Sequence, residues 1–286
     1  MGKIKDLSFP ELSNNIEELL TLNKEDFLHL CSKPEDWNTP KTYSTFVNEN
    51  EQMILKYKEF LAYCPMHWAW FLRMLKQQGI NKSFISIPPN LSEIIKEPCI
   101  FVIPHFGLHM LVPHILGHFI KPESHILASG YIDAESVNSS INNILPNVQV
   151  EFMKIPDIWI LRKLIRGYNN GNYPIIYPEI SSSEDKTFFE LKLLGEKVYV
   201  PMGVEHIGRL CKSKVIPIAM TYNEKYELHL GPTLNYTETG SILLPLFSWI
   251  EQLIQNTPYQ WFGWQFMEEM MVSKAIKNEL SLVQKQ

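Results

Sequence analysis

Hydrophobic and polar residues follow different patterns in the first 80 residues and in the rest of the chain. Up to about residue 80, apolar positions recur at helical spacing and predict helices at 14–22, 24–31 and 49–78. In the longest of these, apolar side chains cover more than one narrow stripe. This favours core packing, with an interfacial helix that touches lipid as the alternative. We therefore expect an N-terminal helical region over residues 1–80.

From residue 81 onward, short apolar runs alternate with segments of helical spacing. Apolar runs bounded by turn residues are typical of buried strands in a largely parallel sheet. This order predicts an α/β fold over residues 81–286, with a central mixed or mostly parallel sheet flanked by helices. We expect this part and the helical region to form one compact unit. The expected strands are 100–103, 125–129, 148–152, 174–177, 197–201, 215–222 and 226–230.

The segment 99–121 holds no charged residue before Lys121. Its length matches a membrane-spanning helix, but two prolines interrupt it, and its imidazoles would lack water as a partner in lipid. The pattern favours a strand at 100–103, a turn, and a helix over 108–119. His105 then lies at the junction of strand and helix. The histidines of the segment are His105, His109, His114 and His118.

Two predicted strand ends and one helix start carry candidate chemistry. Open α/β sheets bind ligands beyond the carboxyl ends of their strands. His105 follows one strand, Glu179 follows another, and Gly203 opens a helix. A histidine and a glutamate at strand ends can face one pocket, and imidazoles suit general base work because they titrate near neutral pH. The structural alternatives are that His105 bonds a backbone carbonyl and that Glu179 caps a helix or pairs with a lysine.

Net charge, cysteine usage and histidine spacing each bear on the class of protein. The chain has 286 residues and a net charge of −5, which argues against a general nucleic-acid binder. Its four cysteines are scattered and show no Cys-x-x-Cys pairing, as expected for reduced thiols in the cytoplasm. The spacing of the histidines also fits helical zinc ligands. A third firm ligand is not evident, so we expect no metal.

A basic cluster lies on the helix predicted between the strands 148–152 and 174–177. Arg162, Lys163 and Arg166 share this helix. One interpretation is a solvated helix face. The functional interpretation is a docking surface for an acidic carrier protein or a phosphorylated donor.

Four motifs together resemble a known family. They are His105-Phe106-Gly107, Tyr177-Pro178-Glu179 after a Gly-containing turn, Gly203 leading to Val215-Ile216-Pro217, and Pro258-Tyr259-Gln260-Trp261-Phe262-Gly263-Trp264. Their order and spacing resemble the lysophospholipid acyltransferase superfamily, and most closely its branch of lipid A late acyltransferases. The resemblance extends over about residues 91–264.

The resemblance implies acyl transfer from a thioester to a hydroxyl or amine. It implies a histidine that deprotonates the acceptor, an acid five positions later that orients the imidazole, and neither a metal nor a cofactor beyond the thioester co-substrate. Here His105 matches the histidine, but Met110 stands where the acid is expected. Because methionine cannot accept the Nδ1 proton, His109 becomes a candidate for a second catalytic residue. The substrate-binding residues we expect are Gly107, Glu179 and Gly203.

We therefore predict an acyltransferase of lipid or natural-product biosynthesis. Its donor is an acyl carrier protein or coenzyme A thioester, and its acceptor is a small molecule, a peptide or a carrier-bound group. No apolar anchor is visible at the start of the sequence, so we expect a cytoplasmic protein with at most peripheral contact to the inner membrane face. The alternatives are a non-catalytic protein that binds acyl groups or carriers, and a thioester hydrolase in which His105 activates water.

Overall fold

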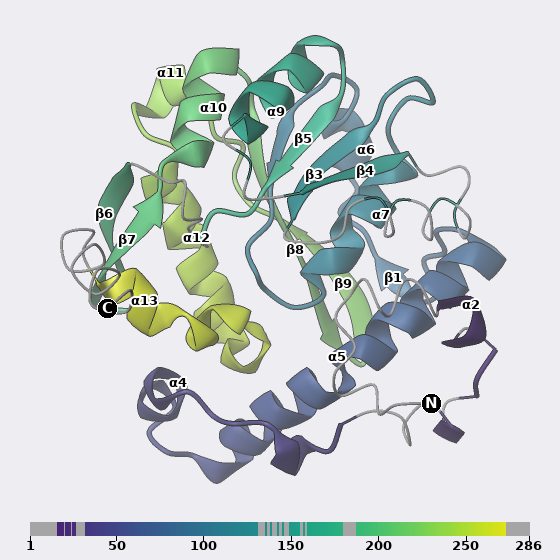
Figure 1. The fold of residues 1–286 in the computed structure, drawn as a ribbon, viewed down its shortest axis with the longest axis vertical. Helices are drawn as coiled ribbons and strands as arrows, with labels where there is room; N and C mark the ends of the chain where they lie inside the picture. Colours follow the sequence, from purple (N-terminus) through teal and green to yellow (C-terminus); the bar gives the residue numbers. More distant parts are fainter. Residues whose placement is uncertain are drawn as a thin grey trace, which may run out of the picture.

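A computed structural model shows a mostly parallel sheet with helices packed around it (Figure 1). Within the described residues, the sheet has seven strands in the order β1-β9-β8-β2-β5-β3-β4. The pair β8 and β9 is antiparallel, and the other neighbours are parallel. The structure describes residues 16–19, 21–23, 25–26, 32–130, 135, 138, 142, 145, 149–154, 157, 159–179 and 187–272.

The central strands are the most apolar ones. The bounds are β1 (Ile85–Ser86), β2 (Ile100–Val102), β3 (Ile126–Gly130), β4 (Val150–Lys154), β5 (Tyr173–Ile176), β8 (Val215–Asn223) and β9 (Lys225–Leu230). Every residue of β2 and of β5 is buried. Such runs suit positions inside a parallel sheet that is covered on both faces. A separate antiparallel hairpin joins β6 (Phe188–Leu193) to β7 (Glu196–Pro201).

Helices pack around the sheet, and one long helix crosses its lower end in the view of Figure 1. The longest, α5 (Glu51–Gln78), begins where the Asn50 side chain accepts a hydrogen bond from the Met53 N–H, and it ends at Gly79, which has φ +62°. Figure 1 shows α5 across the foot of the molecule, away from α9, α10 and α11. The other α-helices are α2 (Ile16–Leu19), α4 (Lys41–Phe46), α6 (Leu91–Ile94), α7 (Val112–Gly117), α9 (Ile160–Asn169), α10 (Gly203–Cys211), α11 (Tyr236–Thr239), α12 (Leu243–Asn256) and α13 (Met267–Met271).

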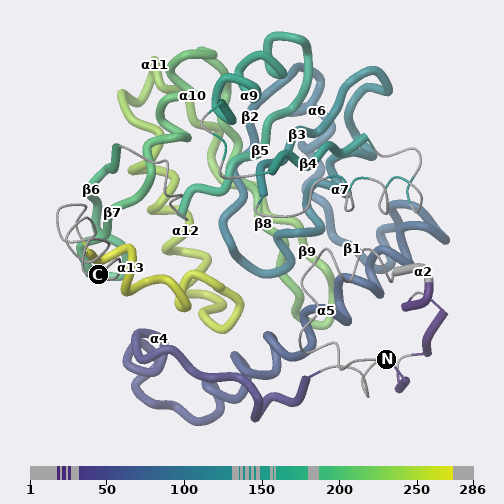
Figure 2. Tube along the Cα trace, viewed as in Figure 1, coloured from purple at the N-terminus to yellow at the C-terminus, as the bar shows by residue number. Residues whose placement is uncertain are grey.

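The segment after α12 lies beside the N-terminal helices (Figure 2). Two short 3-10 helices follow α12, at Pro258–Gln260 and Phe262–Gln265. The Trp264 ring packs against Tyr43 and Phe46, with centroids 5.3 and 5.0 Å away. Buried residues of α5 and of the sheet belong to one continuous apolar cluster. Thus this C-terminal segment is held between α4, α5 and the loop that leaves β2.

The predicted fold class is confirmed. The seven expected strands all exist within a residue or two of their predicted bounds, and the helix expected at 49–78 is α5. β1 and β6 were not predicted, because β1 is too short to show a pattern and β6 exposes charged residues. The helix expected at 24–31 falls mostly outside the described residues. Over the described part of the chain, no helix is both long and apolar enough to cross a membrane.

Candidate active site

The loop that follows β2 carries His105 and depends on a glycine. Pro104 ends the strand because it has no backbone N–H to donate. Gly107 has φ +57°, and a Cβ atom there would lie 1.9 Å from the Met220 carbonyl oxygen. The Leu108 N–H donates to the same oxygen at 2.7 Å. Glycine at 107 therefore lets the loop pack against β8 and fixes the place of His105.

His105 and Glu179 follow two neighbouring strands at matched positions. Val102 lies opposite Ile176 in the β2–β5 pair, and His105 and Glu179 each come three residues after these partners. Both side chains therefore reach the same edge of the sheet. His105 Nδ1 donates to Glu179 Oε2 at 2.8 Å, although 74 residues separate the two in the chain. The backbone N–H of His105 donates to the same oxygen, also at 2.8 Å.

This contact gives the imidazole an acid, but not at the position that the resemblance implies. The acid follows β5 and does not lie five residues after His105. Met110, at the expected position, belongs to the short 3-10 helix His109–Leu111. A carboxylate can only accept, so Nδ1 of His105 carries the proton of this bond. The remaining nitrogen, Nε2, has no hydrogen bond among the described residues, and 17% of the His105 side chain is exposed. This arrangement leaves Nε2 available to a substrate.

Glu179 itself is buried, with 1% of its surface exposed. Its second oxygen, Oε1, accepts a hydrogen bond from the indole N–H of Trp261 at 2.9 Å. Burial of a carboxylate is costly unless donors replace water, and three N–H groups do so here. Glu179 contacts His105 rather than lining the adjacent pocket, so its predicted role in binding substrate stays a prediction.

Aromatic rings surround the His105 imidazole. The centroids of Tyr177, His109 and Phe266 lie 4.7, 5.1 and 5.8 Å from that of His105. Burial, and then the Glu179 charge, raise the pKa of Tyr177. The phenol therefore stays neutral at physiological pH.

His109 is buried beside His105 and is held neutral. Burial, and then the charge of His105, lower the pKa of His109 well below its usual value. Its Nδ1 has no hydrogen-bond partner in the described part of the chain. The Nδ1 proton of His105 already goes to Glu179, so the geometry supports packing by His109 more than orientation of His105.

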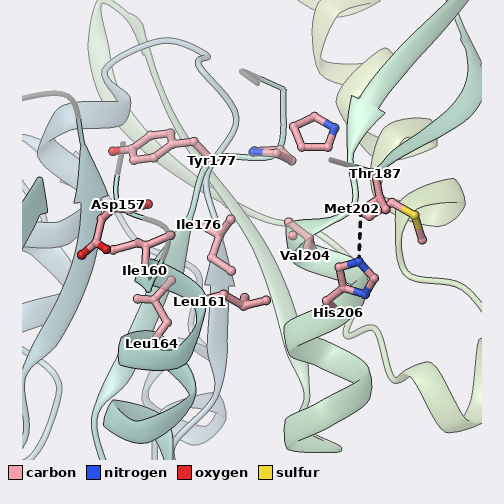
Figure 3. Close-up of a pocket in the computed structure, with 14 residues that line it drawn as sticks. Asp157, Ile160, Leu161, Leu164, Ile176, Tyr177, Thr187, Met202, Val204 and His206 are labelled. Atoms are coloured by element: carbon pink, nitrogen blue, oxygen red, sulfur yellow. Dashed lines mark hydrogen bonds between the residues drawn. The ribbon is translucent and has the colours of Figure 1, made fainter. Parts of the chain in front are cut away.

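A pocket of about 180 Å³ opens next to Tyr177, beyond the carboxyl ends of β3 and β5. Figure 3 shows Tyr177 and Ile160 on one side of it and Val204, Met202 and His206 on the other. Tyr177 thus contacts both the pocket and the His105 ring. The full lining comprises Ser129, Asp157, Ile160, Leu161, Leu164, Ile176, Tyr177, Pro178, Thr187, Pro201, Met202, Gly203, Val204 and His206.

The start of α10 forms one wall of this pocket. Gly203 lies in the lining, and a Cβ atom there would meet open space, while its role in binding substrate stays a prediction. His206 Nε2 and Thr187 Oγ1 lie 3.3 Å apart at the rim. Neither residue belongs to a motif of the sequence. His206 alone carries a signal, in that it follows Gly203 within one helical turn.

The basic cluster lies on α9, which also supplies apolar residues to the pocket. Lys163 Nζ donates to Asp157 Oδ2 at 2.6 Å. The Arg162 guanidinium lies over the exposed Trp159 ring, with its carbon 4.7 Å from the ring centroid. Arg166 lies in the last turn of α9. Two of the three cations are thus held in place near the pocket rim.

His114 and His118 lie away from this site. His114 is fully buried on α7, packs against the Phe152 ring, and has no hydrogen bond to either nitrogen within the described chain. Among the described residues, no group of three His, Cys, Asp or Glu side chains converges as metal ligands do.

The chain is thus an α/β protein with a mostly parallel sheet, and a histidine and a glutamate are paired beyond the carboxyl ends of two of its strands. The family model for bacterial lipid A biosynthesis acyltransferases matches residues 91–265, and the chain belongs to this family. The match covers both strand ends, the pocket and the Trp261 segment. No curated protein matches the sequence.

Proposed function

We propose that this protein transfers an acyl group from a carrier-protein or coenzyme A thioester to a hydroxyl or amine, with His105 as the general base. The acceptor is a small molecule, a peptide or a carrier-bound group. The hydrogen bond from His105 Nδ1 to Glu179 Oε2 carries the proposal, because it leaves the Nε2 lone pair free to take a proton. Membership of an acyltransferase family supports the type of reaction.

The proposed step is a direct displacement. Nε2 of His105 takes the proton as the acceptor oxygen or nitrogen attacks the thioester carbonyl carbon. The new C–O or C–N bond forms, the C–S bond breaks, and the imidazolium returns its proton to the departing thiolate. Glu179 keeps the imidazole in the correct tautomer and stabilises the transient positive charge.

We propose that the acyl chain of the donor binds in the pocket beside Tyr177. Five aliphatic side chains, those of Ile160, Leu161, Leu164, Ile176 and Val204, contribute to its walls beside polar groups such as Asp157. An apolar chain that enters it leaves water, which contributes roughly 0.8 kcal/mol for each buried CH₂ group. Tyr177 links this pocket to the site, since it lines the pocket and its ring lies against the His105 imidazole.

The basic cluster on α9, which comprises Arg162, Lys163 and Arg166, supports a carrier protein as the donor. Arg162 and Arg166 are exposed on α9, a helix that also lines the pocket, and the exposed Trp159 ring beside Arg162 adds an apolar contact. An acidic partner meets such a surface with charge complementarity, which speeds its association. A coenzyme A thioester, whose phosphates are also anionic, is the alternative donor.

We place the protein in the cytoplasm, with contact to the inner membrane face at most peripheral. The thiols of Cys64, Cys99 and Cys211 are free. Burial raises the pKa of Cys99 to about 12 and that of Cys64 well above its usual value. Such unpaired, inert thiols fit a reducing compartment.

A transfer assay with His105→Ala tests this function. Wild type is given a panel of acyl carrier and coenzyme A thioesters, with and without hydroxyl and amine acceptors, and intact masses are recorded. We expect acceptor-dependent acyl loss, lowered about 10²–10⁴-fold in the variant without loss of thermal stability. Acyl loss independent of any acceptor would indicate a hydrolase, and retained acyl ligand without turnover would indicate a binding protein.

A further inference from the structure

Trp261 binds the carboxylate oxygen that His105 leaves free. Its indole N–H donates to Glu179 Oε1 at 2.9 Å, and the side chain is fully buried. The two residues are 82 positions apart in the chain. His105, Glu179 and Trp261 thus form one line of hydrogen bonds that starts at the half-buried imidazole and ends in the core.

The backbone around Trp261 also holds the loop that carries His105. The Gly107 N–H donates to the Gln260 carbonyl at 2.7 Å, and the Phe262 N–H donates to the His105 carbonyl at 2.8 Å. Segment 260–262 therefore fixes the position of the histidine through its backbone and that of the acid through the indole. A shift of this segment would move both groups together.

We propose that Trp261 is a positioning residue for the reaction proposed above, which this inference takes as its basis. Its N–H holds the Glu179 carboxylate against Nδ1 and partly neutralises the negative charge of that carboxylate. It thereby sets how strongly the imidazole holds a proton. Of the described residues, the titratable groups that face the imidazole are Glu179, His109 and Tyr177. Tyr177 and His109 are neutral, so Glu179 provides the charge that the imidazole senses.

Trp264 supplies a matched control in the same segment. It is also buried, its ring lies 4.9 Å from that of Trp261, and its N–H donates to the Pro258 carbonyl at 2.8 Å. Trp261→Phe and Trp264→Phe therefore remove similar volume and one indole hydrogen bond each. Only the first of them removes a donor to Glu179.

The test compares these two variants by two independent readouts. The first is titration of the His105 ring followed by NMR, which needs no turnover. The second is the pH profile of acyl transfer, with kcat and KM measured separately. Without the indole N–H, the carboxylate favours the imidazolium more strongly. We expect Trp261→Phe to move the ring titration and the acid limb of the profile to higher pH. We also expect it to lower kcat about 10- to 100-fold, a share of what a general base supplies, with KM unchanged.

We expect Trp264→Phe to lower the melting temperature by a similar amount without either change. If Trp261→Phe gives the same ring titration and kcat as Trp264→Phe, the inference is wrong and Trp261 only fills the core. A shifted ring titration without any acyl transfer in wild type would reject the proposed function, and with it a role of Trp261 in that reaction, whereas transfer by wild type with no difference between the two variants would overturn the inference alone. Should Trp261→Phe not fold, 3-benzothienylalanine at position 261 keeps the shape of the indole without its N–H, and the same outcomes apply.

Discussion

Nδ1 of His105 lies 2.8 Å from Oε2 of Glu179, at the ends of two strands that pair side by side. The acid of this pair follows a neighbouring strand and does not belong to the segment that carries the histidine. Each residue lies three positions beyond the paired residues Val102 and Ile176, so strand pairing brings the two loops side by side. Backbone hydrogen bonds between the loop of His105 and the segment 260–262 then fix the position of His105.

Replacing the acid tests this pair directly. Glu179→Gln keeps the shape but places an amide where the carboxylate accepts the Nδ1 proton, which favours the wrong tautomer. We expect acyl transfer to fall about 10²- to 10⁴-fold. Glu205→Gln is the matched control, since Glu205 is buried and accepts from the Ile242 and Leu243 N–H groups at 2.9 and 3.0 Å. It should lower the melting temperature and spare the rate; equal rate losses in both variants would argue for a structural role of Glu179.

Restoring an acid at the position that the resemblance expects should bring no benefit. Because Glu179 already binds the Nδ1 of His105, Met110→Glu adds a second, partly buried carboxylate that the imidazole does not need, and its burial costs free energy. We expect transfer rates equal to or below those of wild type, measured with the same donor panel. A variant that works faster than wild type would show that Glu179 does not complete the site.

Neutralising the α9 cluster should affect one kind of donor. Arg162→Gln, Lys163→Gln and Arg166→Gln together should weaken the use of a carrier-protein donor by at least about tenfold and leave a small thioester mimic unaffected. The wild-type preference should also decline with added salt. The control is the triple change of Arg209, Lys212 and Lys214 to Gln, at the end of α10 and before β8. Losses that are equal for both donors would exclude a docking role.

The buried His114 should make the fold sensitive to acid. Burial, and then His118, lower the pKa of His114 to about 3, whereas the unfolded imidazole titrates near 6.5. Between these values the unfolded state binds more protons, so stability is full above pH 6.5 and is lost as the pH falls toward 3. The loss from this residue is about 2 kcal/mol at pH 5.

Urea unfolding of wild type and His114→Leu at pH 7.5 and pH 5 checks this. The variant should lose less stability between the two pH values, and at pH 7.5 it should be at least as stable, because two unpartnered buried nitrogens are removed. His109 is also held neutral by burial, so some acid sensitivity should remain. An unchanged pH dependence in His114→Leu would contradict the assignment.

The sequence predicted much of the fold because its signals are local. Short apolar runs bounded by turn residues, such as 100–103 and 174–177, favour buried strands, and the long helical pattern at 49–78 gave α5. The pattern of apolar positions did not predict β6, because this strand exposes charged residues and, within the described chain, pairs with β7 alone. His105 and Glu179 were singled out for the same local reason, since each follows a predicted strand.

The partners of the active-site side chains depend on contacts between segments that are distant in the sequence. The sequence by itself determined that a histidine and a glutamate stand at strand ends and that position 110 holds no acid. It did not determine that β2 and β5 are neighbours in register, which brings Glu179 rather than His109 to Nδ1 of His105. Nor did it determine that the Trp261 N–H meets Glu179, because a buried indole looks the same in sequence whatever its N–H contacts. Only the tertiary structure decided these partners, since strand order and side-chain direction depend on how the whole sheet packs.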